Sequence, residues 1–166
     1  MGDSLFDDSW TRMHATGAGE PFHAYPHWHL AQDEAHVIIK GKVQLIQNGV
    51  VRIVSLKDGT VITRQGVVHS IKSFPGEEAI VEETTMPIGT MEQKVLFFRN
   101  MLAPGMHQSF VGLMQVFYYR DAYPALPTRI RWLEWLLVVV VGEWVAQLLG
   151  YRIPDKHLRF KTVPSA

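Results

Sequence analysis

The chain of 166 residues contains no cysteine. Disulfide bonds and thiolate-held metals, including the usual structural zinc sites, are therefore excluded. The chain also lacks an excess of either charge, because 16 Lys and Arg residues balance 16 Asp and Glu residues. Proteins that bind nucleic acids usually carry an excess of Lys and Arg, which contact the phosphates. This chain has no such excess, so we expect no nucleic-acid partner.

The start of the chain lacks the features of a signal peptide. Residues 1–8 are acidic, without the basic and then apolar layout that directs secretion. Together with the missing cysteines, this start favours a cytoplasmic location. A chain of 166 residues has the usual size of one domain, so we expect one principal core.

Short strands separated by turn signals are the pattern of residues 21–86. Runs rich in β-branched residues alternate with turn sequences such as Asn48-Gly49 and Lys57-Asp58-Gly59, each of which predicts a hairpin. Short strands at this spacing favour an antiparallel sandwich or barrel. We expect residues 1–20 to form an N-terminal arm that precedes this core.

The pattern becomes helical in residues 87–166. Apolar spacing predicts helices over 91–101, 108–119 and 128–150, the last beginning at a Thr128 cap and ending at Gly150. We expect this extension to pack on the barrel. The apolar segment 132–149 approaches membrane-spanning length, but Glu134, Glu143 and Gln147 interrupt it. Burial against the barrel or in a dimer is therefore favoured over membrane contact, and a true span is favoured least.

Histidine is abundant, and its spacing is the most informative feature of the chain. The pattern is His27-x-His29, four residues, Glu34, six residues and Gly41, with His69 further on. Alternate residues of a strand share a face, so His27 and His29 can point into a barrel together. Residues 31–33 would form a turn that brings Glu34 onto the next strand. Three imidazoles and a carboxylate suit one divalent Fe, Mn, Ni, Cu or Zn ion.

His36 lies two positions after Glu34, so it should face the same interior. It can act there as an acid or base, or it can be a core histidine that is bonded to a neighbour. Glu34 has two open roles as well, because it can bind the metal or leave the metal and act as a base.

The histidine pattern resembles the first motif of the cupin superfamily, with a full match from His27 to Gly41. Residues 66–69 resemble the Gly-x-x-His core of the second motif, although Arg64 and Ser73 stand where Pro and Asn are usual. The resemblance covers roughly residues 20–86. It implies a mainly β fold, a cupin-like antiparallel β-barrel (jelly roll), followed here by two or three C-terminal helices. It also implies a homodimer.

A metal-dependent cupin enzyme acting on a small hydrophobic or aromatic, polyketide-like substrate is the function that this resemblance implies. Dioxygenase-type oxidation is the reaction that we favour, and a role in secondary metabolism would suit it. A non-redox isomerase, cyclase or decarboxylase and a non-catalytic small-ligand-binding cupin remain as alternatives. A structural or membrane-associated role for segment 132–149 is the third hypothesis.

Overall fold

The structure is a computed structural model, and it describes residues 10–86, 100 and 109–151. The chain divides into two compact units. One takes in Met1–Met91 and Ala122–Arg129, and the other takes in Glu92–Asp121 and Ile130–Ala166. We call them the β unit and the helical unit. The helix expected over 91–101 lies outside the described residues, apart from Asn100.

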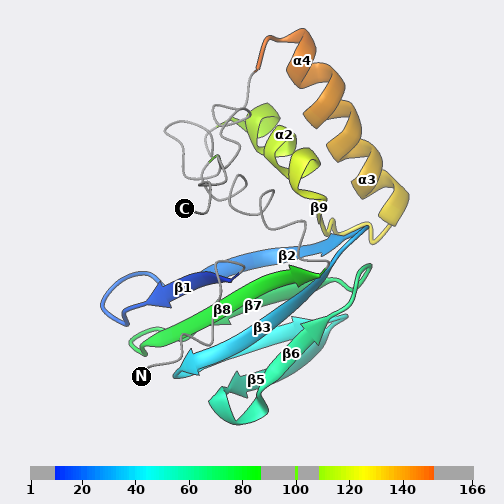
Figure 1. Ribbon diagram of the computed structural model, residues 1–166. Helices are drawn as coiled ribbons and strands as arrows, with labels where there is room; N and C mark the ends of the chain where they lie inside the picture. The colour runs from blue at the N-terminus through cyan, green and yellow to red at the C-terminus, as the bar shows by residue number, and fades with distance from the viewer. Residues whose placement is uncertain (1–9, 87–99, 101–108, 152–166) are drawn as a thin grey trace, which may run out of the picture. The chain divides into compact units, whose positions relative to one another are not determined.

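The β unit consists of two antiparallel sheets (Figure 1). Their strands, in chain order, are β1 (Thr11–Ala15), β2 (His23–His29), β3 (Asp33–Lys40), β4 (Lys42–Gln47), β5 (Val50–Ser55), β6 (Thr60–Thr63), β7 (His69–Ser73), β8 (Ala79–Met86) and β9 (Ala122–Pro124). The first sheet has the order β1-β8-β3-β6 and the second the order β5-β4-β7-β2-β9. Without β9, this is the strand order of a double-sheet jelly roll. The fold class expected from the cupin resemblance is confirmed.

Two strands lie outside the expected barrel segment of residues 21–86. β1 falls within the segment expected to be an arm, and it pairs with β8. β9 falls within the segment expected to be helical, and it pairs with β2 through His27, Trp28 and His29. The β unit therefore takes strands from both flanking segments.

One expected turn is confirmed and the other is wrong. Asn48 and Gly49 both have positive φ, 47° and 84°, and they join β4 to β5 as a hairpin. Residues 56–58 instead form a single 3₁₀ turn, η1 (Leu56–Asp58). The Asp58 carboxylate accepts hydrogen bonds from the Ser55 amide and hydroxyl, and this cap begins the turn. The chain then crosses to the other sheet, where β6 pairs with β3.

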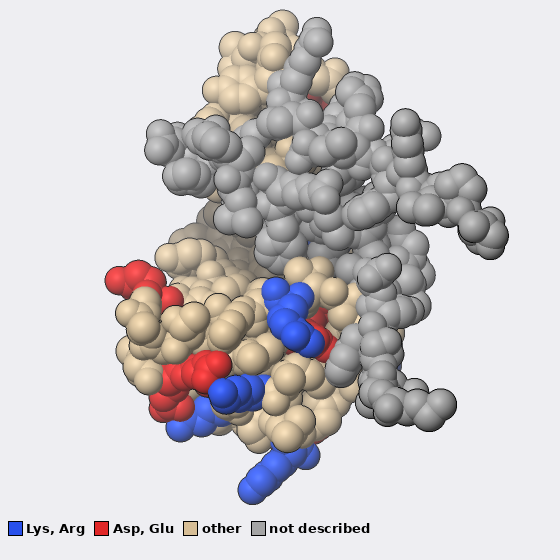
Figure 2. All heavy atoms as spheres, turned by 60° about the vertical axis from the view of Figure 1, so that its left-hand side comes forward, with Lys and Arg blue, Asp and Glu red and all other residues tan. Residues whose placement is uncertain are grey.

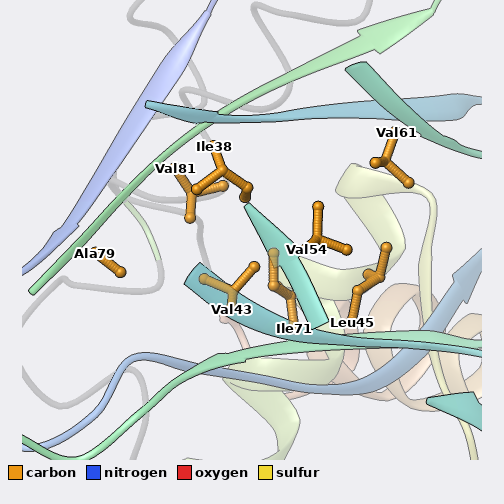
Figure 3. Packing of buried hydrophobic residues seen from close by; sticks show 8 residues of the cluster. All are labelled: Ile38, Val43, Leu45, Val54, Val61, Ile71, Ala79 and Val81. Carbon is orange, nitrogen blue, oxygen red and sulfur yellow. The ribbon is translucent and has the colours of Figure 1, made fainter. Parts of the chain in front are cut away.

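The hydrophobic core of the β unit lies between its two sheets (Figure 3). Both sheets contribute to it, and its buried members are Ile38, Val43, Leu45, Val54, Val61, Ile71, Ala79 and Val81. Along β3 and β7, the inward-facing residues change from polar to apolar. Glu34 and His36 precede Ile38, and His69 precedes Ile71, all of them buried. The interior is thus apolar at one end and polar at the other.

The helical unit contains α2 (Phe110–Arg120) and a second helix that runs through α3 (Arg131–Val139), the π-helical segment η4 (Val140–Val145) and α4 (Ala146–Leu148). The predicted helices over 108–119 and 128–150 are confirmed, but the Thr128 cap is wrong. The N-cap is Ile130, because Arg129 adopts a positive φ of 55° just before the helix. Among the described residues, no helix has both the length and the apolar character needed to cross a membrane.

Candidate metal centre

His27 and His29 lie near the end of β2, and His69 begins β7, the next strand in the sheet. His27 is the direct partner of His69 in the strand register. Directly opposed residues in antiparallel strands lie on the same face, so these two imidazoles lie side by side, with ring centroids 4.3 Å apart. A bulge between Ala24 and His27 breaks the alternation earlier in β2. His23 and Tyr25 are consequently exposed.

Glu34 comes from the opposite sheet, where β3 begins one residue earlier. Residues 30–32 carry the chain from β2 to β3, so the turn expected over 31–33 begins and ends one residue earlier. Asp33 fixes this junction, because its carboxylate accepts hydrogen bonds from the Gln65 amide at 2.7 Å and from Arg64 Nη1 at 2.6 Å. These bonds hold the pKa of Asp33 below its usual value. Arg64 therefore serves as an anchor for the β6–β7 loop, which leads to His69.

The four expected ligands converge at the polar end of the barrel interior. Ligand atoms of His27, His29, Glu34 and His69 all lie within 4.8 Å of one another. Glu34 Oε1 is 3.2 Å from His29 Nε2, and Glu34 Oε2 is 2.9 Å from His69 Nε2. Three of the four residues are buried, and His27 is partly exposed.

The protonation of these imidazoles follows from the contacts of their outer nitrogens. His27 Nδ1 lies 2.7 Å from the carbonyl oxygen of Tyr25, and His69 Nδ1 lies 3.1 Å from that of Val67. A carbonyl oxygen can only accept, so each Nδ1 carries a proton and donates it. In a neutral ring, Nε2 then presents a lone pair to the centre of the cluster. Such outer hydrogen bonds are the usual support for metal-binding histidines.

The contact between His69 and Glu34 tests whether a metal suits this site. A neutral His69 with its proton on Nδ1 directs a lone pair at the Glu34 carboxylate, only 2.9 Å away. Two acceptors at this distance repel unless a proton or a cation lies between them. A divalent cation satisfies all four groups at once, so the residues fit a metal ion.

Burial and the neighbouring His69 and His29 lower the pKa of His27 to about 3, against smaller opposing effects of Glu34 and the Tyr25 carbonyl. His27 is therefore neutral at physiological pH. A neutral imidazole can bind a metal without first losing a proton.

Gln32 is a buried side chain that the sequence pattern did not single out. Its amide lies 2.9 Å from His29 Nδ1. The nearest amide atom is the nitrogen Nε2, which donates a hydrogen bond to Nδ1 and so fixes the orientation of the His29 ring. Turning the amide by 180° would bring its oxygen to the same place, where it would accept a proton on Nδ1 and leave the Nε2 lone pair for a metal. Gln32 occupies the predicted turn, where its contact with a side chain three residues away cannot be read from strand alternation. We infer that Gln32 positions His29.

Replacing Gln32 with leucine should weaken Zn²⁺ binding by about 10- to 100-fold, which is the usual effect of losing a support for a metal-binding histidine. Isothermal titration of the metal-free protein measures this change. Gln115→Leu makes the same substitution at a buried glutamine of the helical unit and should leave Zn²⁺ affinity unchanged. Equal affinities in the two variants would remove the role assigned to Gln32.

His36 is fully within the interior, as its position after Glu34 predicts, with 1% of its surface exposed. Its Nε2 lies 3.9 Å from Glu34 Oε2 and 3.5 Å from an oxygen of Glu83 on β8. Glu83 did not emerge from the sequence pattern. The strand register reveals it, because Glu83 is the direct partner of His36 across β3 and β8.

The charged side chains on the surface of the β unit are of mixed sign. On the face seen in Figure 2, blue Lys and Arg side chains are interspersed with red Asp and Glu side chains. Ion pairs on this unit include Lys40 with Glu78 at 2.7 Å and Lys42 with Glu77 at 3.2 Å. On this face, the described residues form no stripe of one sign.

No family model matches the chain. The chain is 27% identical over 140 residues to a curated protein of Penicillium expansum named "Probable oxidoreductase patJ". The match covers 76% of this chain and 43% of that protein, so the chain spans less than half the length of this relative.

Solved structures that are similar to the chain include double-stranded β-helix proteins and dioxygenases. One is an uncharacterised Klebsiella pneumoniae protein with a double-stranded β-helix domain, at 22% identity and a TM-score of 0.40, with 47% of this chain and 65% of that chain covered. Another is salicylate 1,2-dioxygenase from Pseudoaminobacter salicylatoxidans, at 15% identity and a TM-score of 0.41, with 52% and 23% covered. The fold is assigned from the strand order of the two sheets.

Proposed function

We propose that this chain is a metal-dependent enzyme that acts on a small hydrophobic or aromatic organic substrate, with dioxygenase-type oxidation as its reaction. The observation that carries the proposal is the convergence of His27, His29, Glu34 and His69 on one point inside the barrel. The 27% identity to a probable oxidoreductase supports the redox form of the reaction.

His27, His29, Glu34 and His69 would hold the metal, the histidines through Nε2. A bound Fe, Mn, Ni or Cu ion would supply redox chemistry, and Zn would supply Lewis-acid chemistry only. The protein fixes the ring orientations through Tyr25, Val67 and Gln32. It also surrounds the site with buried side chains, which limits the access of water. Glu34 and His36 are the two residues that we place nearest the reaction.

The proposal is tested by the metal content and oxygen uptake of protein purified without added metal. Iron, copper, nickel or manganese together with oxygen uptake on addition of aromatic hydroxyl compounds would support dioxygenase chemistry. Zinc without oxygen uptake would replace it with a non-redox isomerase, cyclase or decarboxylase reaction. Protein that binds such compounds but neither metal nor oxygen would be a ligand-binding module, and the proposal would fail.

His29→Ala removes one of the four ligands and should lower the affinity of the four-residue site for Zn²⁺. Complete four-ligand zinc sites bind with about 10–16 kcal/mol, so one ligand accounts for about 3 kcal/mol. This corresponds to a loss of about 100-fold in affinity. His23→Ala, on the exposed part of the same strand, is the matched control. Unchanged affinity in His29→Ala would contradict the ligand assignment.

The partner and location expected from the sequence remain proposals. We propose a homodimer that pairs through residues 1–20 and the helix over 132–149, where Trp132, Trp144 and Leu148 are exposed in the structure. Membrane contact through the same apolar residues is the alternative partner. A cytoplasmic location and a role in secondary metabolism likewise stay predictions. Light scattering of detergent-free protein measures whether the chain is a dimer.

A further inference from the structure

Beyond the four expected ligands, the barrel interior holds a second group of ionisable side chains. Glu34, His36 and Glu83 are all buried, and they offer ligand atoms that lie within 4.8 Å of one another. Glu34 and His36 alternate on β3, and Glu83 lies directly opposite His36 on β8. The strand register therefore places all three side chains on one face, and Glu34 is shared with the first group.

The separations within this group are longer than hydrogen bonds, and one of them matches the spacing of two ligands on one cation. His36 Nε2 is 3.5 Å from Glu83 Oε2 and 3.9 Å from Glu34 Oε2. Hydrogen bonds from nitrogen to oxygen are usually about 2.7–3.2 Å long. Two ligands about 2.0–2.2 Å from one metal ion lie about 2.8–3.1 Å apart at the right angles of an octahedral ion, and about 3.3–3.6 Å apart at tetrahedral angles. The His36–Glu83 distance falls within the tetrahedral range, and the His36–Glu34 distance lies above both ranges.

The surroundings make a cation favourable at this position. Further along the same two strands, the inward-facing residues are Ile38 and Val81, which are fully buried core residues. Placing two carboxylates at the edge of an apolar core is costly, because both lose hydration and repel each other. A divalent cation between Glu34 and Glu83 offsets this cost by direct coordination.

We propose that Glu34, His36 and Glu83 form a second divalent-cation site, and that Glu34 bridges the two sites. The inference rests on the proposed function, because the bridging carboxylate belongs to the first site. Its Oε1 faces His29 and its Oε2 faces His69 and His36. This assignment makes His36 a metal ligand in place of an acid or base.

The second site differs from the first in its ligand chemistry. It contains two carboxylates and one imidazole, whereas the first contains three imidazoles and one carboxylate. Carboxylate-rich sites suit harder cations such as Mn²⁺ and Mg²⁺, and imidazole-rich sites suit Zn, Cu, Fe and Ni. The second site would therefore bind a divalent cation that accepts carboxylate oxygens, and Mn²⁺ is the practical probe for it.

The test is the number of Mn²⁺ ions that the full chain retains after the unbound ion is removed, measured by elemental analysis. Electron paramagnetic resonance on the same samples detects magnetic coupling between two neighbouring Mn²⁺ ions. We expect two equivalents and a coupled signal in the wild-type protein. In Glu83→Gln we expect one equivalent and the signal of an isolated ion.

Glu82→Gln is the matched control, because it makes the same change one residue away. Glu82 lies on the other face of β8, where Arg12 Nε donates a hydrogen bond to it at 2.8 Å. This variant should keep two equivalents. If Glu83→Gln does not fold, His36→Asn replaces it in the same measurement, with the same expected loss of one equivalent.

The outcomes separate this inference from the proposed function. One equivalent in the wild-type protein would overturn the second site and leave the first intact. No retained metal of any kind would overturn both. Two equivalents in Glu83→Gln, or one in Glu82→Gln, would overturn the assignment of the second site to Glu83.

Discussion

Glu34→Gln is expected to abolish metal-dependent activity and to lower the affinity for divalent metal by about 100-fold or more. Glu34 is the one carboxylate among the four expected ligands, and its two oxygens face His29 and His69. Glutamine keeps the volume of the side chain but loses the charge that stabilises a cation in a buried site. Metal titration and oxygen uptake on the same protein sample measure the two losses.

A thermal shift separates the loss of a ligand from general damage to the fold. Metal that binds only the folded state raises the melting temperature as its concentration increases. Wild-type protein should show this rise, and Glu34→Gln should not, although its metal-free melting temperature should be equal or higher because a buried charge is gone. Glu82→Gln should retain the metal-induced rise. A full rise in Glu34→Gln would remove Glu34 from the ligand set.

Gly41→Ala is expected to lower the free energy of unfolding of the β unit by about 3 kcal/mol, from backbone strain together with overpacking. Gly41 joins β3 to β4 with a φ of 72°, and an added Cβ would lie 2.1 Å from the carbonyl oxygen of Glu78. A backbone atom cannot move aside as a flexible side chain can, so the start of β8 would have to shift. Urea unfolding followed by circular dichroism measures the change.

Gly49→Ala measures the backbone strain alone, without the steric clash that alanine at position 41 would cause. Gly49 has a φ of 84°, but an added Cβ there would meet nothing within 4 Å. Its cost should be about 1 kcal/mol, which is typical of a non-glycine residue in the left-handed region. Equal losses in the two variants would show that the contact between Gly41 and Glu78 contributes nothing.

The sequence predicted those features that depend on local alternation and turn chemistry. Alternation on β2 placed His27 and His29 on one face, and the turn before β3 allowed Glu34 to meet them. The Asn48-Gly49 hairpin follows from residues that tolerate positive φ. The structure brings these expected ligands together with His69, which lies on a distant part of the chain.

The features that the sequence could not predict depend on contacts between strands that are distant along the chain. Glu83 faces His36 only because β8 pairs with β3 in one register, which no local pattern reveals. Gln32 acts through a side-chain contact within a turn, where alternation gives no guidance. The Asp58-Gly59 turn resembles a hairpin signal, but the Ser55 cap converts it into the crossing between sheets.

We propose that His27, His29, Glu34 and His69 surround one metal ion. Crystals of the metal-loaded protein, measured at the absorption edge of the bound metal, test it most directly. We expect an anomalous peak with three imidazole nitrogens and a Glu34 oxygen at about 2.0–2.2 Å. A peak elsewhere on the chain, with these four side chains directed away from it, would rule out this set of ligands.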